Sequence, residues 1–161
     1  MTPEKSSKLT GISDITGKIL RIKHATEADM GFILENLKKY HLDMEDLHHS
    51  QFVIAAENGN LIGFGRLKNI GETYEIGCVV VIEERRGRGI GSLIVKHLID
   101  YSPLKTVYVI TDLVDYFIKL GFAKTEEGSK ELLDSLDRTC KIKGKQNAVL
   151  MVYKKEQVGI L

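Results

Sequence analysis

Strand-like segments recur along most of the chain, each bounded by turn residues. Apolar runs and apolar–polar alternation predict strands at 19–23, 52–56, 61–67, 74–82, 106–111, 122–125 and 147–154. The pair Asn58-Gly59, which tight hairpins favour, separates the second of these strands from the third. The early strands are therefore expected to form an antiparallel meander.

Helix-like periodicity lies between several of these strands. Apolar residues recur at helical spacing at Met30, Ile33 and Leu37. They follow Thr26, a residue type that is favourable at the N-cap of a helix. Further helices are expected over 92–101, 113–120 and 129–137, with 40–49 as a short second helix or a loop. A meander followed by strands that alternate with helices predicts an α/β fold, in which helices cover both faces of a mixed sheet.

One domain accounts for most of the chain. Residues 1–18 are polar and small and are expected to form an N-terminal tail, and residues 156–161 a short C-terminal tail. Residues 19–155 are then expected to form a single domain, as is usual for a chain of 161 residues.

The most informative segment is Gly-rich and joins the strand ending near Val81 to the helix expected from Ser92. A helix N-terminus leaves backbone N–H groups unpaired and carries positive partial charge, and glycines let a phosphate approach without a Cβ clash. Arg86 and Arg88 add charge that can pair with a diphosphate. The segment lacks both the Gly-Lys-Ser/Thr ending of a Walker A loop and the third glycine of the dinucleotide fingerprint. It predicts a diphosphate-binding loop of another kind.

From Arg86 to Gly91 the loop reads Arg-x-x-Gly-x-Gly, and at this point the sequence resembles the GCN5-related N-acetyltransferase (GNAT) superfamily. As in that family, an apolar strand precedes the motif, and a later helix ends in an aromatic pair and Gly-Phe, at 116–122. The resemblance runs from about Leu20 to Lys154 and is greatest to small stand-alone relatives of the N-acetylglutamate synthase acetyltransferase domain. It implies the GNAT fold, with a mixed, mostly antiparallel sheet of about six to seven strands flanked by helices on both faces.

The resemblance also implies an enzyme that transfers the acetyl group of acetyl-CoA to a primary amine of a small molecule, with amino acids among the candidate acceptors. The amine attacks directly, in one ternary complex. The backbone of Val79, Val80 and Val81 would pair with the pantetheine arm, and the Val80 N–H would polarise the thioester carbonyl. The pyrophosphate would be held by Arg86, Gly87, Arg88, Gly89, Ile90, Gly91 and Ser92, through amides, arginine charge and the Ser92 hydroxyl.

Two side chains are candidates for proton transfer. Glu75 stands where family members often carry a glutamate that acts as a base through water, and simple alternation places it on one face with Val79. The alternative is a strand-end glutamate in solvent. Phe117 occupies the family's usual position for an acid tyrosine, which leaves the neighbouring Tyr116, another hydroxyl or water to protonate the thiolate, unless it leaves unprotonated. Neighbours on a helix point about 100° apart, so Tyr116 is otherwise a packing or surface residue.

Composition and charge argue against several classes of binding partner. The chain has 23 Lys and Arg against 22 Asp and Glu, a net charge of +1, so no overall attraction to nucleic acid or an anionic membrane is expected. Cys78 and Cys140 have no ligand-like spacing with the histidines, so no metal is expected. No apolar run approaches a membrane span and no secretory signal is recognised, so a cytoplasmic protein is expected.

The acceptor side is less well defined. Tyr40 and His41 fall in the region that shapes the acceptor pocket in the GNAT fold and are candidate substrate contacts. Homodimers are common in the family. Two other functions stay open, a non-catalytic CoA-binding sensor or interaction module, which the missing tyrosine supports, and an acetyltransferase of protein N-termini or lysines. An open groove in place of a closed acceptor pocket would favour the latter.

Overall fold

The computed structural model describes residues 12–13, 19–142 and 144–156, and the chain divides into two compact units. The first unit comprises Met1–Arg66 and Cys78–Leu98, and the second Leu67–Gly77 and Ile99–Leu161. The strands are β1 (Ile12–Ser13), β2 (Ile19–His24), β3 (Phe52–Glu57), β4 (Asn60–Ile70), β5 (Thr73–Val81), β6 (Thr106–Thr111), β7 (Ala123–Lys124) and β8 (Val149–Lys154). The α-helices are α1 (Met30–Lys39), α2 (Ile90–Tyr101), α3 (Val114–Lys119) and α4 (Lys130–Lys141). Of the two predicted tails, only β1 and Glu156 fall among the described residues.

Antiparallel pairing builds the first unit. β1 pairs with β2, β2 with β3 and β3 with β4, each antiparallel. The end of β5 follows beside β4, where the Ile82 N–H donates to the Ile62 carbonyl at 2.9 Å. Asn58 and Gly59 have φ of 50° and 82°, the positive values that a type I′ hairpin requires. The predicted meander is confirmed.

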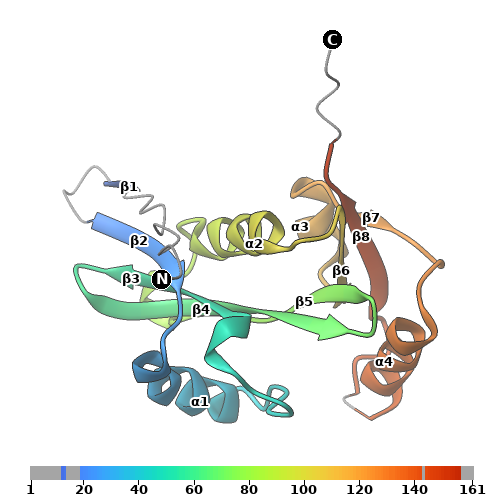
Figure 1. The fold of residues 1–161 in the computed structure, drawn as a ribbon, viewed down its shortest axis with the longest axis horizontal. Coiled ribbons are helices and arrows are strands. Elements are labelled where there is room, and N and C mark those ends of the chain that lie inside the picture. The colour runs from blue at the N-terminus through green and yellow to red at the C-terminus, as the bar shows by residue number, and fades with distance from the viewer. Residues whose placement is uncertain (1–11, 14–18, 143, 157–161) are drawn as a thin grey trace, which may run out of the picture. The chain divides into compact units, whose positions relative to one another are not determined.

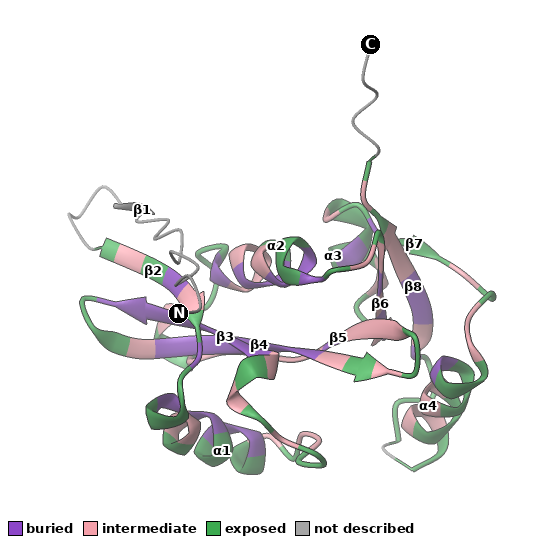
Figure 2. Ribbon diagram, in the orientation of Figure 1, coloured by how far each residue is buried: buried purple, intermediate pink, exposed green. Residues whose placement is uncertain are grey.

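Helices α1 and α2 cover opposite faces of the strands in the first unit (Figure 1). On one face, Phe64 of β4 packs with Ile33 and Leu37 of α1 in an apolar core. On the other face, a Cβ at Gly65 would lie 2.6 Å from Ile94 of α2, so the helix rests directly on the strand. Figure 2 shows that β3 and β4 are buried over most of their length. Because successive strand residues point to opposite faces, the prediction of helices on both faces is confirmed in this unit.

The second unit combines parallel and antiparallel pairs. β5 runs parallel to β6, with Glu75 opposite Tyr108, and β8 pairs antiparallel with β6 on one side and with β7 on the other. The strand order in this unit is β5-β6-β8-β7. With the meander, this order makes the fold mixed and mostly antiparallel, as predicted. The described residues form eight strands, of which β1 and β7 are two residues long.

Helix α3 ends at the Gly-Phe pair that the sequence singles out. The Phe122 N–H donates to the Phe117 carbonyl at 3.0 Å, and the Gly121 N–H to the Ile118 carbonyl at 3.0 Å. These two bonds define a Schellman motif, which satisfies the last carbonyls of a helix. The Phe117 and Phe122 rings meet edge to face at 5.3 Å, so the aromatic residues of this stretch close the helix and fill the core.

Several predicted helix boundaries differ from those of the structure. Helix α2 begins at Ile90, two residues before the predicted start, so Ile90 and Gly91 belong to the helix. Ahead of α1 the chain forms a 3-10 turn over Glu27–Asp29, in which the Thr26 N–H donates to Asp29 Oδ2 at 2.8 Å. These deviations lie at helix ends, where side-chain hydrogen bonds and tighter turns compete with the α-helix. Of the two alternatives predicted for residues 40–49, the loop is the correct one: these residues form no α-helix, and a 3-10 turn over His49–Gln51 leads into β3.

Cys78 interrupts the extended backbone of β5. Its φ is 51°, in the left-handed region that costs a non-glycine residue roughly 1–2 kcal/mol. Regular alternation assumes that every residue of a strand is extended, so the placement of Glu75 on one face with Val79 stays a prediction. Cysteine has no preference for positive φ, so no local signal in the sequence marks this break.

Candidate functional site

The predicted diphosphate loop is a short, open turn at the start of α2. Gly87 and Gly89 have φ of 79° and 78°, and a Cβ at either position would enter open space. The first hydrogen bond of α2 runs from the Leu93 N–H to the Gly89 carbonyl at 3.2 Å, so the amides of Ile90 and Gly91 have no acceptor within the helix. Such amides at an exposed helix N-terminus form a site suited to a phosphate group.

Arg85 anchors the segment ahead of the loop. Its Nε donates to Glu57 Oε1 at 2.9 Å, and its Nη1 to the Glu84 carbonyl at 3.3 Å. Glu57, at the end of β3, is buried with 7% of its surface exposed. The Arg85 guanidinium is held in an ion pair with this mostly buried carboxylate. It therefore positions the loop and is not a candidate diphosphate ligand.

Glu57→Gln is expected to loosen this anchor. The amide keeps the size of the side chain but loses the charge-assisted hydrogen bond, so the free energy of unfolding should fall by roughly 1.5–3 kcal/mol. Urea denaturation measures the loss. Glu126 is exposed and provides the control, because the same change there should leave stability near that of the unmodified chain. Equal losses in the two variants would contradict an anchoring role.

Arg86 and Arg88 differ in how they are held. Arg86 Nε donates to the Val81 carbonyl at 2.9 Å, and Arg86 Nη2 donates to the Tyr40 hydroxyl at 2.9 Å. The Arg86 guanidinium carbon also lies 5.5 Å from the centre of the Tyr40 ring, a cation–π distance. Arg88 is exposed and makes no ion pair or hydrogen bond with the residues that the structure describes. Of the two, Arg88 is the guanidinium available to an incoming diphosphate.

The remaining predicted coenzyme contacts lie in the same unit. Val80 is buried in the apolar core, while Val79 and Val81 are partly exposed. Ile90 is 5% exposed, so only its backbone is available to a ligand. Ser92 is half-buried in the first turn of α2. The end of β5, the loop and the start of α2 thus form one continuous segment in this unit.

Tyr40, which follows α1, lines a cavity of about 220 Å³ in the first unit. The lining residues come from α1 and from the segment after β5: Phe32, Glu35, Asn36, Lys39, Tyr40, Ile82, Glu83 and Glu84. His41 is exposed, has φ of 54° and does not line this cavity. The structure therefore brings Tyr40, but not His41, together with Arg86 and the cavity.

Arg66 is a buried charged residue that the sequence analysis did not single out. It is 1% exposed, and its guanidinium donates to Gln51 Oε1 at 2.9 Å and to the Glu45 carbonyl at 2.7 Å, with Asp43 Oδ2 at 3.5 Å. These contacts tie the segment between Tyr40 and β3 to β4. The available signal was an arginine inside an apolar strand run, because a buried charge requires partners from elsewhere in the chain.

Glu75 and Tyr116 belong to the second unit. Glu75 is half-buried in β5. Tyr116 is 37% exposed, and its ring lies edge to face with Phe117 at 5.1 Å. Phe117 is 6% exposed, so the family's usual acid position holds a packed ring without a hydroxyl. This unit also contains a cavity of about 590 Å³, lined by the end of β4 and polar residues of α4, which no sequence pattern predicted.

Comparison with known families decides the assignment. Residues 21–122 match the model of the acetyltransferase (GNAT) family. The chain belongs to the GNAT family. The match includes the meander, the loop, α2 and the Gly-Phe pair that ends α3, so the family inferred from these residues is confirmed. No curated protein sequence matches the chain.

Solved structures share the GNAT fold at low sequence identity. N-acetylglutamate synthase from Neisseria gonorrhoeae, complexed with coenzyme A and N-acetyl-glutamate, has a TM-score of 0.66 and 22% identity, over 86% of this chain and 35% of that one. The Mycobacterium tuberculosis protein Rv2747, in complex with CoA and NLQ, has a TM-score of 0.66 and 21% identity, over 84% and 99%. Arabidopsis thaliana Naa50, in complex with the bisubstrate analogue CoA-Ac-MVNAL, has a TM-score of 0.60 and 14% identity, over 84% and 98%. The chain thus spans about a third of the length of the synthase.

The described part of the GNAT chain contains neither a membrane-spanning helix nor a cluster of metal-binding side chains. No helix there is both long and apolar enough to cross a membrane. No three His, Cys, Asp or Glu side chains among those residues gather in a way that could hold a metal ion.

Proposed function

We propose that this GNAT chain transfers the acetyl group of acetyl-CoA to a primary amine of a small molecule. The observation that carries the proposal is the open loop before α2, with Gly87 and Gly89 in the left-handed region and Arg88 exposed beside them. Backbone donors and one available guanidinium fit a diphosphate, and a side chain at either glycine would occupy the space that it needs. Membership of the acetyltransferase family supports acetyl-CoA as the ligand.

The proposed reaction is aminolysis of a thioester. The neutral amine attacks the acetyl carbonyl carbon, the C–N bond forms and the C–S bond breaks, so the product is an amide and the CoA sulfur leaves as a thiolate. Glu75 is the proposed base that takes the proton of the amine through water, and the Val80 N–H is the proposed donor to the carbonyl oxygen. Tyr116 or water returns one proton to the thiolate.

The cavity beside Tyr40 supports a small acceptor. Its volume of about 220 Å³ lies below the range of pockets that bind drug-sized ligands, so it suits only a small group. Glu35, Glu83 and Glu84 bring three carboxylates to its lining and Lys39 brings one ammonium group, which favours an acceptor that carries both signs of charge. Amino acids have this character, and the structurally similar synthase was solved with N-acetyl-glutamate.

Release of free CoA thiol tests the proposal. The chain is incubated with acetyl-CoA and, one at a time, amino acids, small amines and peptides with free N-termini. We expect release above acetyl-CoA hydrolysis with at least one small amine. Calorimetric binding of acetyl-CoA without release from any acceptor would support a non-catalytic CoA-binding module, and release with peptides alone would support a protein acetyltransferase.

A further inference from the structure

Arg86 connects the diphosphate loop to the end of α1. It directly precedes Gly87 in the chain, so its backbone is part of the loop. Its side chain reaches back to the Val81 carbonyl and to the Tyr40 hydroxyl, at 2.9 Å each. Tyr40 in turn lines the cavity of about 220 Å³ beside α1. One side chain therefore joins the end of β5, the loop and the cavity.

The geometry of the guanidinium makes this connection stiff. Arginine presents planar N–H donors in a fixed fork, so the bond from Nε to the Val81 carbonyl also sets the direction of Nη2. Nη2 points to the Tyr40 hydroxyl, and the guanidinium lies over the Tyr40 ring at 5.5 Å. Lys39 also approaches that ring, with its Nζ 5.4 Å from the ring centre. A lysine at position 86 could not reproduce the two directed bonds from one planar group.

We propose that Arg86 is a positioning residue, which holds Tyr40 at the cavity and transmits coenzyme binding at the loop to the acceptor side. This inference rests on the proposed function, in which the loop binds the diphosphate of acetyl-CoA. A diphosphate held by the loop amides and Arg88 restrains the backbone at position 86. The fork of Arg86 then restrains Tyr40, so the cavity is ordered when the coenzyme is bound.

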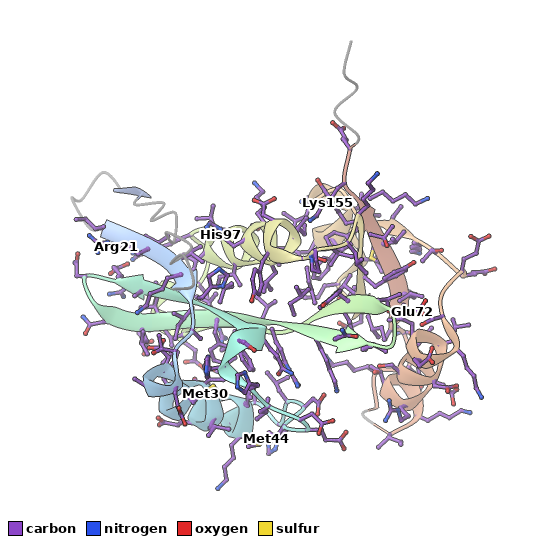
Figure 3. All side chains as sticks on the ribbon, viewed as in Figure 1. Arg21, Met30, Met44, Glu72, His97 and Lys155 are labelled. Atoms are coloured by element: carbon purple, nitrogen blue, oxygen red, sulfur yellow. The ribbon has the colours of Figure 1, made fainter. Side chains whose placement is uncertain are left out.

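Hydrogen exchange of the peptides covering residues 38–47 tests the connection without an acceptor. In the unmodified chain, acetyl-CoA is expected to slow amide exchange in these peptides. Arg86→Lys and Tyr40→Phe each remove the bond between the two side chains, so acetyl-CoA should still bind to both variants but should no longer slow exchange there. Arg21→Lys is the matched control, because Arg21 is exposed on β2 (Figure 3) and should leave the slowing intact.

Kinetics with the best acceptor from the thiol assay separates positioning from ligand binding. Arg86→Lys and Tyr40→Phe are expected to raise the acceptor KM by roughly tenfold, as loss of a charge-assisted hydrogen bond implies, while the acetyl-CoA KM changes by less than about twofold. A raised acetyl-CoA KM with an unchanged acceptor KM would make Arg86 a diphosphate ligand and overturn the proposal. So would slowing of exchange in Arg86→Lys equal to that in the unmodified chain. If no acceptor supports turnover, the proposed function fails, and the exchange experiment still decides the connection.

Discussion

Gly89→Ala is expected to raise the Kd for acetyl-CoA by at least about tenfold while the chain still folds. Gly89 has φ of 78° and would direct a Cβ into open space at the start of α2. A methyl group there occupies the volume through which a phosphate oxygen reaches the amides, and it also strains the turn that presents them. Isothermal titration calorimetry with acetyl-CoA measures the change.

The hairpin between β3 and β4 supplies a matched control for this strain. Gly59 has φ of 82°, and a Cβ there would also meet open space. Gly59→Ala should therefore cost a similar roughly 1–2 kcal/mol of folding stability and leave the Kd for acetyl-CoA unchanged. Equal Kd values in the two variants would show that the loop is not the coenzyme site.

Glu75→Gln is expected to lower kcat by about 10²- to 10⁴-fold, the usual contribution of a general base. Glutamine is nearly the same size but accepts no proton, so the amine would lose its proposed base. Coenzyme binding should persist, because the proposed coenzyme contacts are the end of β5, the loop and α2. Steady-state kinetics with the best acceptor, alongside calorimetry with acetyl-CoA, measures the two effects separately.

The turn between β4 and β5 offers the control for Glu75. Glu72 is exposed in that turn, three positions from Glu75 (Figure 3). Glu72→Gln makes the same chemical change on the same hairpin and should leave kcat near that of the unmodified chain. Unchanged turnover in Glu75→Gln would remove Glu75 as the base and leave proton removal to water or to another side chain.

The loop and its surroundings could be predicted because their signals are local. The strand, the glycines and the helix are consecutive in the chain, and Gly87 and Gly89 have positive φ in the structure. The Gly-Phe pair is equally local, since the two hydrogen bonds of its Schellman motif join Phe122 to Phe117 and Gly121 to Ile118. The hairpin at Asn58-Gly59 belongs to the same class. Such features depend on backbone preferences of a few neighbouring residues.

The separate roles of the three arginines at the loop could not be predicted from local sequence patterns. Arg85, Arg86 and Arg88 have the same chemistry in the sequence, and Arg86 and Arg88 were both expected to bind a diphosphate. In the structure, Arg85 donates to Glu57, which is 28 positions away in the chain. Arg86 donates to Tyr40, which is 46 positions away. No local pattern encodes partners at that distance. The sequence alone therefore could not show which guanidinium has partners within the protein and which is available to a ligand.

The sequence by itself determined the family, the order of the elements and the position of the Gly-rich loop before α2, because periodicity, turn residues and the Arg-x-x-Gly-x-Gly spacing are properties of adjacent residues. The tertiary structure alone decided that Arg66 is buried, that Cys78 breaks the pleat of β5 and that Arg86 is bound to Tyr40. Each of these depends on packing and hydrogen bonding between segments that are distant in the chain. Such contacts form only once the strands and helices are assembled, and they override what an isolated segment prefers.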